Sequence, residues 1–291
     1  MATLRDIRKK LKAIQSTKKI TAAMKMVAAA KLRKVQDRML NFRPYAKKME
    51  TVLSNLAKVS EREMHPLLAL RPRKNVEVIV ITSDRGLCGA FNSNILKAAS
   101  VFIKETMKEN VELTVSTVGR KSRDFFRRRD IKIRKSWVGL SGRITFADAQ
   151  EISKDIIENY VDEKIDEFVI VSSEFRSLLV QQPSVLKLLP MGSMEEEGKK
   201  DESAETVDML YEPSMDTIFE RLLPKHIEIQ VYRALIETSA SEEAARMTAM
   251  ENATKNCSEL ITKVTLLANK VRQAAITKDL MDIVGGVEAL K

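Results

Sequence analysis

The chain has 291 residues, of which 44% are apolar, 31% charged and 5% aromatic, and its formal net charge is +10. This composition suits one globular core with long helices rather than two ordinary domains. No run of 18 apolar residues occurs, so the sequence predicts no membrane-spanning helix, and the first ten residues lack an export signal's apolar core. Its two cysteines and two histidines match no zinc spacing, so we expect a reducing compartment, no metal and no cofactor.

Residues 1–60 are predicted to form one long helix with a coiled-coil seam. Small or apolar residues recur there in alternating steps of three and four, the 3.5-residue period of a coiled coil. These seam positions are Leu4, Ile7, Leu11, Ile14, Ala28, Leu32, Val35, Met39, Phe42, Ala46, Met49, Leu53 and Leu56. The seam continues across Pro44, so we expect a bend at this proline and not a helix end.

Between Ile14 and Ala28 the apolar residues leave this register. Continuing the seam would place Lys18, Thr21 and Lys25 in it, whereas the apolar side chains are Ile20, Met24, Met26 and Val27. This pattern fits either a patch that packs against another protein or a local stutter in the coil. Residues 1–58 also carry a net charge of +13, which indicates either a solvated flank or a contact with an acidic partner.

Residues 60–75 read as a linker, and the hydrophobic period changes after it. Short β-branched runs alternate with helical patterns over 75–190, which predicts a layered Rossmann-like α/β domain. The expected strands cover 76–82, 111–118, 131–138, 168–173 and 185–189, and the expected helices cover 93–109, 120–129 and 146–161.

The loop after the first predicted strand, SDRGLCGAFN, is the most enzyme-like stretch of the chain. It joins a strand to a helix, where nucleotide phosphates often bind. It lacks the spacing of a dinucleotide fingerprint, and no Gly-Lys-Ser/Thr follows as a phosphate-binding loop requires. Cys88 has no candidate histidine base. A structural turn or a protein-contact loop is therefore favoured over a nucleotide site or a nucleophilic cysteine.

Residues 191–213 are polar and acidic and predict a flexible connector. A second long helix is expected over 214–291, in which Pro224 either causes a kink or opens a separate helix. Its seam follows the same 3-and-4 rhythm: Met250, Ala253, Cys257, Leu260, Val264, Leu267, Val271 and Ala274.

Two complementary seams, one at each end of the chain, predict an antiparallel coiled coil of the N- and C-terminal helices that carries the α/β domain as an insertion. At about 1.5 Å per residue the first helix spans roughly 80 Å and the second roughly 100 Å. The second helix should therefore outrun its partner. Its tip is apolar at Ile276, Leu280, Met281, Ile283, Val284, Val287 and Leu290. We interpret these residues as apolar on several faces of the helix, which predicts that another protein surrounds this tip.

Three stretches together resemble the gamma subunit of the F-type ATP synthases. They are the N-terminal IRKKLKAIQSTKKITAAMKMVAAAKLRK, the central loop SDRGLCGAFN, and the C-terminal MTAMENATKN with NKVRQAAITKDLMDIVGG. They occur in the family's order and cover both ends and the centre, so the resemblance spans the whole architecture. Apart from Tyr211, the 191–213 stretch matches nothing in the family pattern, and the cysteine-containing insertion of the chloroplast form is absent.

The resemblance implies a central-stalk rotor that is not itself catalytic. In the family, the coiled coil stands in the bore of a hexamer of alternating alpha and beta subunits, and its foot sits with the epsilon subunit on the membrane ring of c subunits. Proton flow turns the ring and the shaft, which drives each beta subunit through its catalytic states. The expected location is the cytoplasmic face of a bacterial inner membrane, as a peripheral protein that meets the membrane only through the ring.

The resemblance also assigns contact residues. Beta-subunit contacts are implied for Met24 and Lys25 at a collar, for Arg85 near the base of the beta subunits, and for Arg272, Gln273 and Thr277 near the tip. Tip residues that would turn inside the family's hydrophobic sleeve are Ile276, Leu280, Ile283, Val284 and Val287. Tyr211 matches a position near the foot and the c ring.

A basic coiled-coil nucleic-acid binder is the rival from another class. It explains the basic N-terminal helix but not the apolar tip, and the chain has no basic groove interleaved with aromatic residues. A nucleotide-binding α/β enzyme is the third alternative, and it fails because the phosphate-binding loop is missing.

Overall fold

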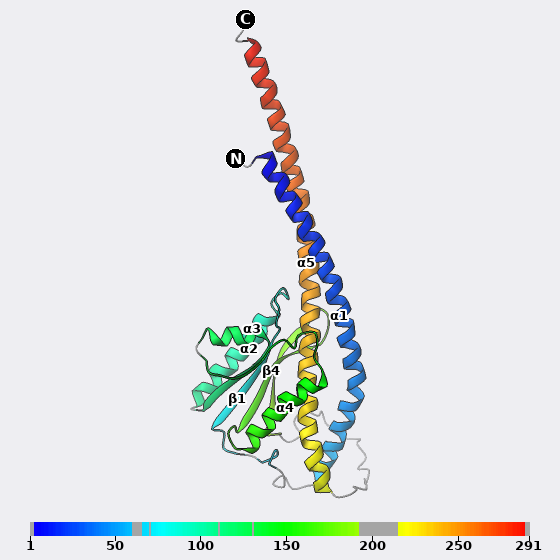
Figure 1. Ribbon diagram of the computed structural model, residues 1–291, viewed down its shortest axis with the longest axis vertical. Coiled ribbons are helices and arrows are strands. Elements are labelled where there is room, and N and C mark those ends of the chain that lie inside the picture. The colour runs from blue at the N-terminus through cyan, green and yellow to red at the C-terminus, as the bar shows by residue number, and fades with distance from the viewer. Residues whose placement is uncertain are drawn as a thin grey trace. The chain divides into compact units, whose positions relative to one another are not determined.

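The structure is a computed structural model that describes residues 3–59, 66–69, 71–109, 111–129, 131–191 and 215–288. Its elements follow the predicted order along the chain (Figure 1). They are α1 (Leu4–Val59), β1 (Asn75–Ile81), α2 (Phe91–Thr106), a short 3-10 helix (Met107–Glu109), β2 (Glu112–Val118), α3 (Arg120–Arg127), β3 (Ile133–Trp137), α4 (Phe146–Val161), β4 (Glu167–Phe175), β5 (Gln181–Leu189) and α5 (Met215–Glu288).

The chain divides into two compact units. The two-helix unit comprises residues 1–29 and 246–291, and the sheet unit comprises residues 30–245. Both long helices continue through their internal prolines, Pro44 in α1 and Pro224 in α5. The alternative of a separate helix opening at Pro224 is therefore wrong. Apart from Met191, the acidic connector predicted for 191–213 lies outside the described residues.

The sheet unit is built on five strands in the order β3-β2-β1-β4-β5. The first four strands along the chain are parallel, and β5 runs antiparallel to β4 as an edge strand. Parallel strands need helices on both faces, and this explains why β1 is apolar at every position after Asn75 except the buried Glu77. Val76, Val78 and Val80 face one core cluster, and Ile79 and Ile81 face the other.

Helices α2 and α3 cover one face of the sheet, and α4 covers the other face together with the part of α5 that belongs to this unit (Figure 1). The second face also receives buried α1 residues, among them Leu32 and Leu53, each no more than 3% exposed. This larger core includes residues of α1 and α5 that belong to the sheet unit, so these parts of the long helices are packed into its core.

The C-terminal seam differs from the predicted one in alternate positions. Leu260 and Leu267 are 47% and 50% exposed, whereas their neighbours Ile261 and Ala268 are half-buried. A 3-and-4 rhythm can start with either step, and the sequence alone does not say which. Thr254 faces the partner helix, so the steps continue from it through 257, 261, 264, 268 and 271. The prediction that Leu260 and Leu267 are buried is wrong for this reason.

Candidate partner-binding surfaces

The two-helix unit is held together by a seam that is partly polar. The hydroxyl groups of Thr21 and Thr254 share a hydrogen bond of 2.8 Å across the pair, and Lys25 Nζ lies 2.7 Å from Glu251 Oε1. Thr21 is buried although the apolar residues around it are not. The N-terminal register therefore continues without interruption through positions 18, 21 and 25, and the alternative of a stutter is wrong.

Most of the apolar residues that leave this register are not covered by the described part of the chain. Ile20, Met26 and Val27 are all exposed, and Met24 is half-buried. We call these four residues the collar patch. Lys25, predicted as a partner contact, is already paired with Glu251, which lies 21 residues before Arg272 on α5. At 1.5 Å per residue, the collar patch and Arg272 are separated by roughly 30 Å along the helix.

The end of α5 is not covered by the part of the chain that the structure describes. Val271 is the last half-buried position, and every described side chain from Arg272 to Gly286 is exposed. Among them are Arg272, Gln273 and Thr277, whose hydroxyl group donates to the Gln273 carbonyl oxygen at 3.0 Å. We call residues 272–288 the tip. The tip spans roughly 25 Å of free helix at 1.5 Å per residue.

The tip carries a row of exposed apolar side chains: Ile276, Leu280, Met281, Ile283 and Val284. The backbone of Val287 is helical, whereas its side chain and all of Leu290 lie outside the described residues. Steps of three and four place Ile276, Leu280 and Ile283 on one side of the helix, with Val284 beside them. Only Met281 stands clearly apart. The apolar surface is therefore more one-sided than the sequence interpretation assumed.

In the sheet unit, Arg85 is exposed on a loop that internal hydrogen bonds hold in place. The Asp84 carboxylate accepts hydrogen bonds of 3.1 Å from the backbone N–H groups of Arg120, Gly139 and Ser141. Burial by itself would raise the pKa of Asp84, but these N–H groups stabilise the carboxylate and hold its pKa below the usual value. Asp84 thus ties together the ends of three parallel strands.

The crevice where a doubly wound sheet would bind a nucleotide is filled by this chain. That crevice lies outside the carboxyl ends of β1 and β4, on either side of which the strand order reverses. There α5 packs against the end of β4, and the Ser173 N–H of β4 donates to Thr238 Oγ1 of α5 at 3.2 Å. The remaining cavity, lined by Thr82, Ser141 and Glu242 among others, measures about 10 Å³. It has room for about one water molecule.

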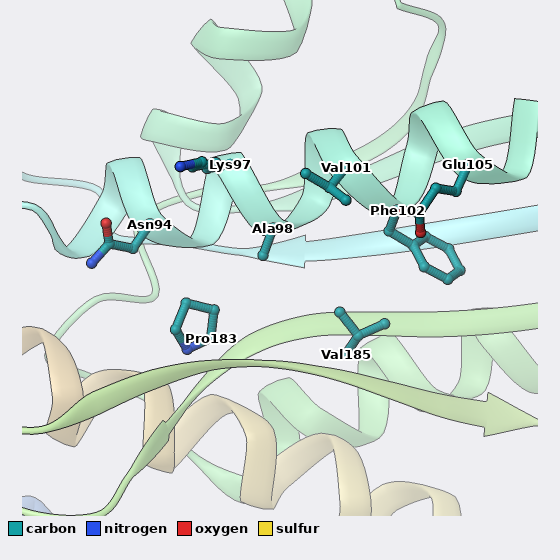
Figure 2. Close-up of a pocket in the computed structure, with 8 residues that line it drawn as sticks. All are labelled: Asn94, Lys97, Ala98, Val101, Phe102, Glu105, Pro183 and Val185. Carbon is teal, nitrogen blue, oxygen red and sulfur yellow. The ribbon is translucent and has the colours of Figure 1, made fainter.

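A wider groove lies between α2 and the edge strand β5 (Figure 2). Its volume is about 480 Å³ and it is open to solvent. Its walls are mainly apolar, with Val101 and Phe102 from α2 facing Pro183 and Val185 from β5. It lacks the convergent backbone N–H groups that would hold a phosphate. The groove suits apolar side chains of a protein better than a nucleotide.

The described residues offer neither a metal site nor a membrane-spanning helix. No group of three or more His, Cys, Asp or Glu side chains in those ranges could hold a metal ion. None of the described helices is long and apolar enough to cross a membrane. Tyr211, predicted to face the foot, lies outside the described residues.

Sequence reasoning missed several residues that the structure places at these surfaces. Asp84 was not singled out, because its partners are 36 to 57 residues away in the chain. Leu87 and the hairpin residues Leu178, Leu179 and Val180 are exposed, although the sequence reads them as ordinary apolar residues. The three adjacent apolar residues between two predicted strands could have indicated an exposed hairpin turn.

Comparison with known proteins places the chain in a family. A family model described as ATP synthase matches residues 3–290. The "ATP synthase gamma chain" of Pelotomaculum thermopropionicum is 48% identical over 291 residues and that of Syntrophus aciditrophicus is 45% identical over 290, with at least 99% of each chain covered.

Solved structures give the same result for the fold. The central stalk and c-ring structure of the Tetrahymena thermophila mitochondrial ATP synthase contains a chain that is 27% identical, with a TM-score of 0.59, and the match covers 80% of this chain and 99% of that one. A rotor chain of the Euglena gracilis mitochondrial ATP synthase has a TM-score of 0.65 at 22% identity, covering 94% and 98%. This chain therefore belongs to the ATP synthase gamma-chain family.

Proposed function

We propose that this chain is the central rotor shaft of an F-type ATP synthase. It transmits torque between a membrane ring of c subunits and a catalytic hexamer of alpha and beta subunits, and so couples proton flow to ATP synthesis or hydrolysis. It belongs to an ATPase complex but performs no chemistry itself. The full-length similarity to gamma chains supports this assignment.

The exposed tip is the structural observation that carries the proposal. Ile276, Leu280 and Ile283 are exposed on one side of the helix, and such exposed apolar surface marks a site that another protein covers. We propose that the alpha and beta subunits supply that cover, with Arg272, Gln273 and Thr277 facing beta-subunit loops. Ile276, Leu280, Ile283, Val284 and Val287 turn inside the sleeve.

The collar patch is the second proposed contact. Exposed Ile20, Met26 and Val27 surround the half-buried Met24, so this stretch offers an apolar surface that the partner helix does not use. Beta subunits pressing on the shaft at Met24 and Lys25 would cover it. Arg85, on its anchored loop in the sheet unit, is the proposed contact near the base of the beta subunits.

The remaining partners follow from the family. We propose that the foot, including Tyr211, meets the c ring and the epsilon subunit, so that the chain is a peripheral protein on the cytoplasmic face of a bacterial inner membrane. The proposed functional division is 1–60 and 214–291 for the two shaft helices, 75–190 for the α/β domain and 191–213 for a flexible connector. No nucleic acid takes part.

Reconstitution tests this function. The full-length chain is added to purified alpha and beta subunits of the same organism, and ATP hydrolysis and co-elution on gel filtration are measured. We expect a stable complex and a strong rise in hydrolysis, because the shaft orders the beta subunits. A matched chain lacking the tip, residues 272–291, controls for non-specific binding of the basic helix. Absence of both co-elution and stimulation with the full chain would refute the rotor assignment.

A further inference from the structure

The hairpin between β4 and β5 presents apolar side chains to solvent. Leu178, Leu179 and Val180 form the turn of this hairpin. Leu179 is 80% exposed, the highest value for a large apolar residue in the described ranges. The turn is held by internal hydrogen bonds: the Ser177 N–H donates to the Val180 carbonyl oxygen at 3.1 Å, and Gln181 Nε2 donates to the Leu178 carbonyl oxygen at 2.8 Å. The end of the hairpin therefore has a fixed conformation.

A second exposed leucine lies at the same edge of the sheet. Strand β4 is parallel to β1, so the hairpin and the loop after β1 both follow carboxyl ends of neighbouring strands. In that loop Leu87 is 64% exposed and adopts a left-handed backbone with φ of 64°. A branched side chain adopts this conformation only when the surroundings impose it, and such strain gathers at functional sites. Asp84 supplies that constraint from one side of Leu87.

Basic residues are exposed at the same edge of the sheet. Arg85, Arg120, Lys121 and Arg143 are exposed and lie on the segments that follow β1, β2 and β3 at the same edge. Two carboxylates near this edge are already engaged, Asp84 by backbone N–H groups and Glu174 by Arg176. An apolar centre with a charged border is the usual anatomy of a protein interface, and this border is positive.

We propose that Leu87, Leu178, Leu179 and Val180, named the carboxyl-edge surface, bind an apolar pocket bordered by carboxylates on the catalytic-hexamer side of the synthase. The inference rests on the proposed function and adds the β4–β5 hairpin to the contacts made by the Arg85 loop. A protein occupant is favoured over an anionic membrane because the hairpin tip has no tryptophan or tyrosine, the residues enriched where proteins meet the membrane interface.

The test uses the full chain with alpha and beta subunits, and it measures the chain concentration that gives half-maximal stimulation of ATP hydrolysis. In the double variant Leu178→Gln with Leu179→Gln, we expect this concentration to rise about tenfold, since central apolar contacts dominate binding. Met107→Gln is the matched control, because Met107 is 56% exposed and lies before β2, at the opposite edge of the sheet. Its half-maximal concentration should stay within about twofold of the unmodified chain. Thermal unfolding of each free chain should be unchanged.

The outcomes separate this inference from the proposed function. If the double variant stimulates hydrolysis like the control, the carboxyl-edge surface is not a contact, while the rotor assignment stands. If the double variant instead loses binding to phosphatidylglycerol vesicles and keeps its affinity for alpha and beta subunits, the occupant is a lipid surface and the inference is overturned. If the unmodified chain fails to stimulate hydrolysis, the proposed function fails and this inference fails with it.

Discussion

His226 predicts a specific loss of stability in mildly acidic solution. This residue lies on α5 in the sheet unit, and its Nδ1 atom is buried without a hydrogen-bond partner among the described residues. Burial disfavours the charged imidazolium and lowers the pKa of His226 to about 4. In the unfolded chain the same group titrates near its ordinary value of about 6.5.

Between these two pKa values the unfolded state binds more protons than the folded state. The contribution of neutral His226 to the free energy of unfolding is therefore fully present above the unfolded-state pKa of about 6.5 and is lost as the pH drops toward 4. Moving from pH 7 to pH 5 should remove about 2 kcal/mol, which corresponds to a fall in the thermal midpoint of roughly 4–8 °C. The assay is thermal unfolding of the free chain, followed by circular dichroism at both pH values.

The variant His226→Gln isolates this effect, because glutamine does not titrate. The difference between its midpoints at pH 7 and pH 5 should shrink by most of the predicted fall. The chain has only one other histidine, His65, so His65→Gln is the matched control and should keep the full difference. An equal pH dependence in the unmodified chain and in His226→Gln would refute the reasoning.

Three further predictions concern the shaft. Leu32→Ala should lower the stability of the free chain by about 2–5 kcal/mol and Leu267→Ala by about 1 kcal/mol or less, because Leu32 is buried and Leu267 half-exposed; equal losses in thermal unfolding would contradict this difference in burial. Removing the chain from Ile283 onward should leave the thermal midpoint of the free chain unchanged but reduce co-purification with alpha and beta subunits, and a lowered midpoint would mean that the tip packs on its own chain. Met24→Lys should leave most ATP hydrolysis intact and reduce proton pumping into vesicles, because a new ammonium group in a tight collar holds the shaft in some rotary positions; unchanged pumping would remove Met24 from the proposed contacts.

The fold was predictable where one local signal decides the structure. Helix α4 covers Phe146–Val161, the predicted range, because Thr145 caps it and Asp148 returns the bond to Thr145 in a capping box. Strand β1 was predictable because burial on both faces leaves the β-branched run Val78–Ile81. The long helices were predictable because the 3.5-residue period persists over many turns.

Pairing across the chain was harder to predict, because one helix does not contain the information. The sequence of α5 allows either Leu260 or Ile261 in the seam, and only the position of α1 selects Ile261. Likewise, Thr21 looked like a gap in the N-terminal seam until Thr254 supplied its hydrogen-bond partner 233 residues later. The pair is satisfied because one hydroxyl group donates to the other, and the carbonyl oxygens of Lys18 and Met250 on their own helices are within reach as further acceptors. No hydrophobic pattern reveals such a pair.

The exposed surfaces were predictable only in part, for a related reason. The exposed tip was predictable because the lengths of the two helices follow directly from their numbers of residues, and one helix is longer than the other. The carboxyl-edge surface was missed, because it forms where loops from separate strands meet at one edge of the sheet. The contact residues taken from the family resemblance, such as Arg272 and Met24, remain predictions that binding experiments must test.

The two-helix unit is built in a way that makes its stability depend on partners. Its buried seam contains small or medium side chains, such as Thr21, Ala28, Cys257 and Val264, and two larger ones, Ile7 and Met250. Large apolar side chains of the same unit remain in water: Ile20, Met26, Val27, Leu260, Leu266, Leu267, Ile276, Leu280, Met281, Ile283 and Val284. A self-sufficient coiled coil would bury its largest apolar residues in its seam. Because a partner that covers these residues binds the folded unit and not the unfolded chain, assembly must add to its stability by mass action. A seam with few large side chains and an apolar exterior thus suits a shaft whose stability rises when other subunits surround it.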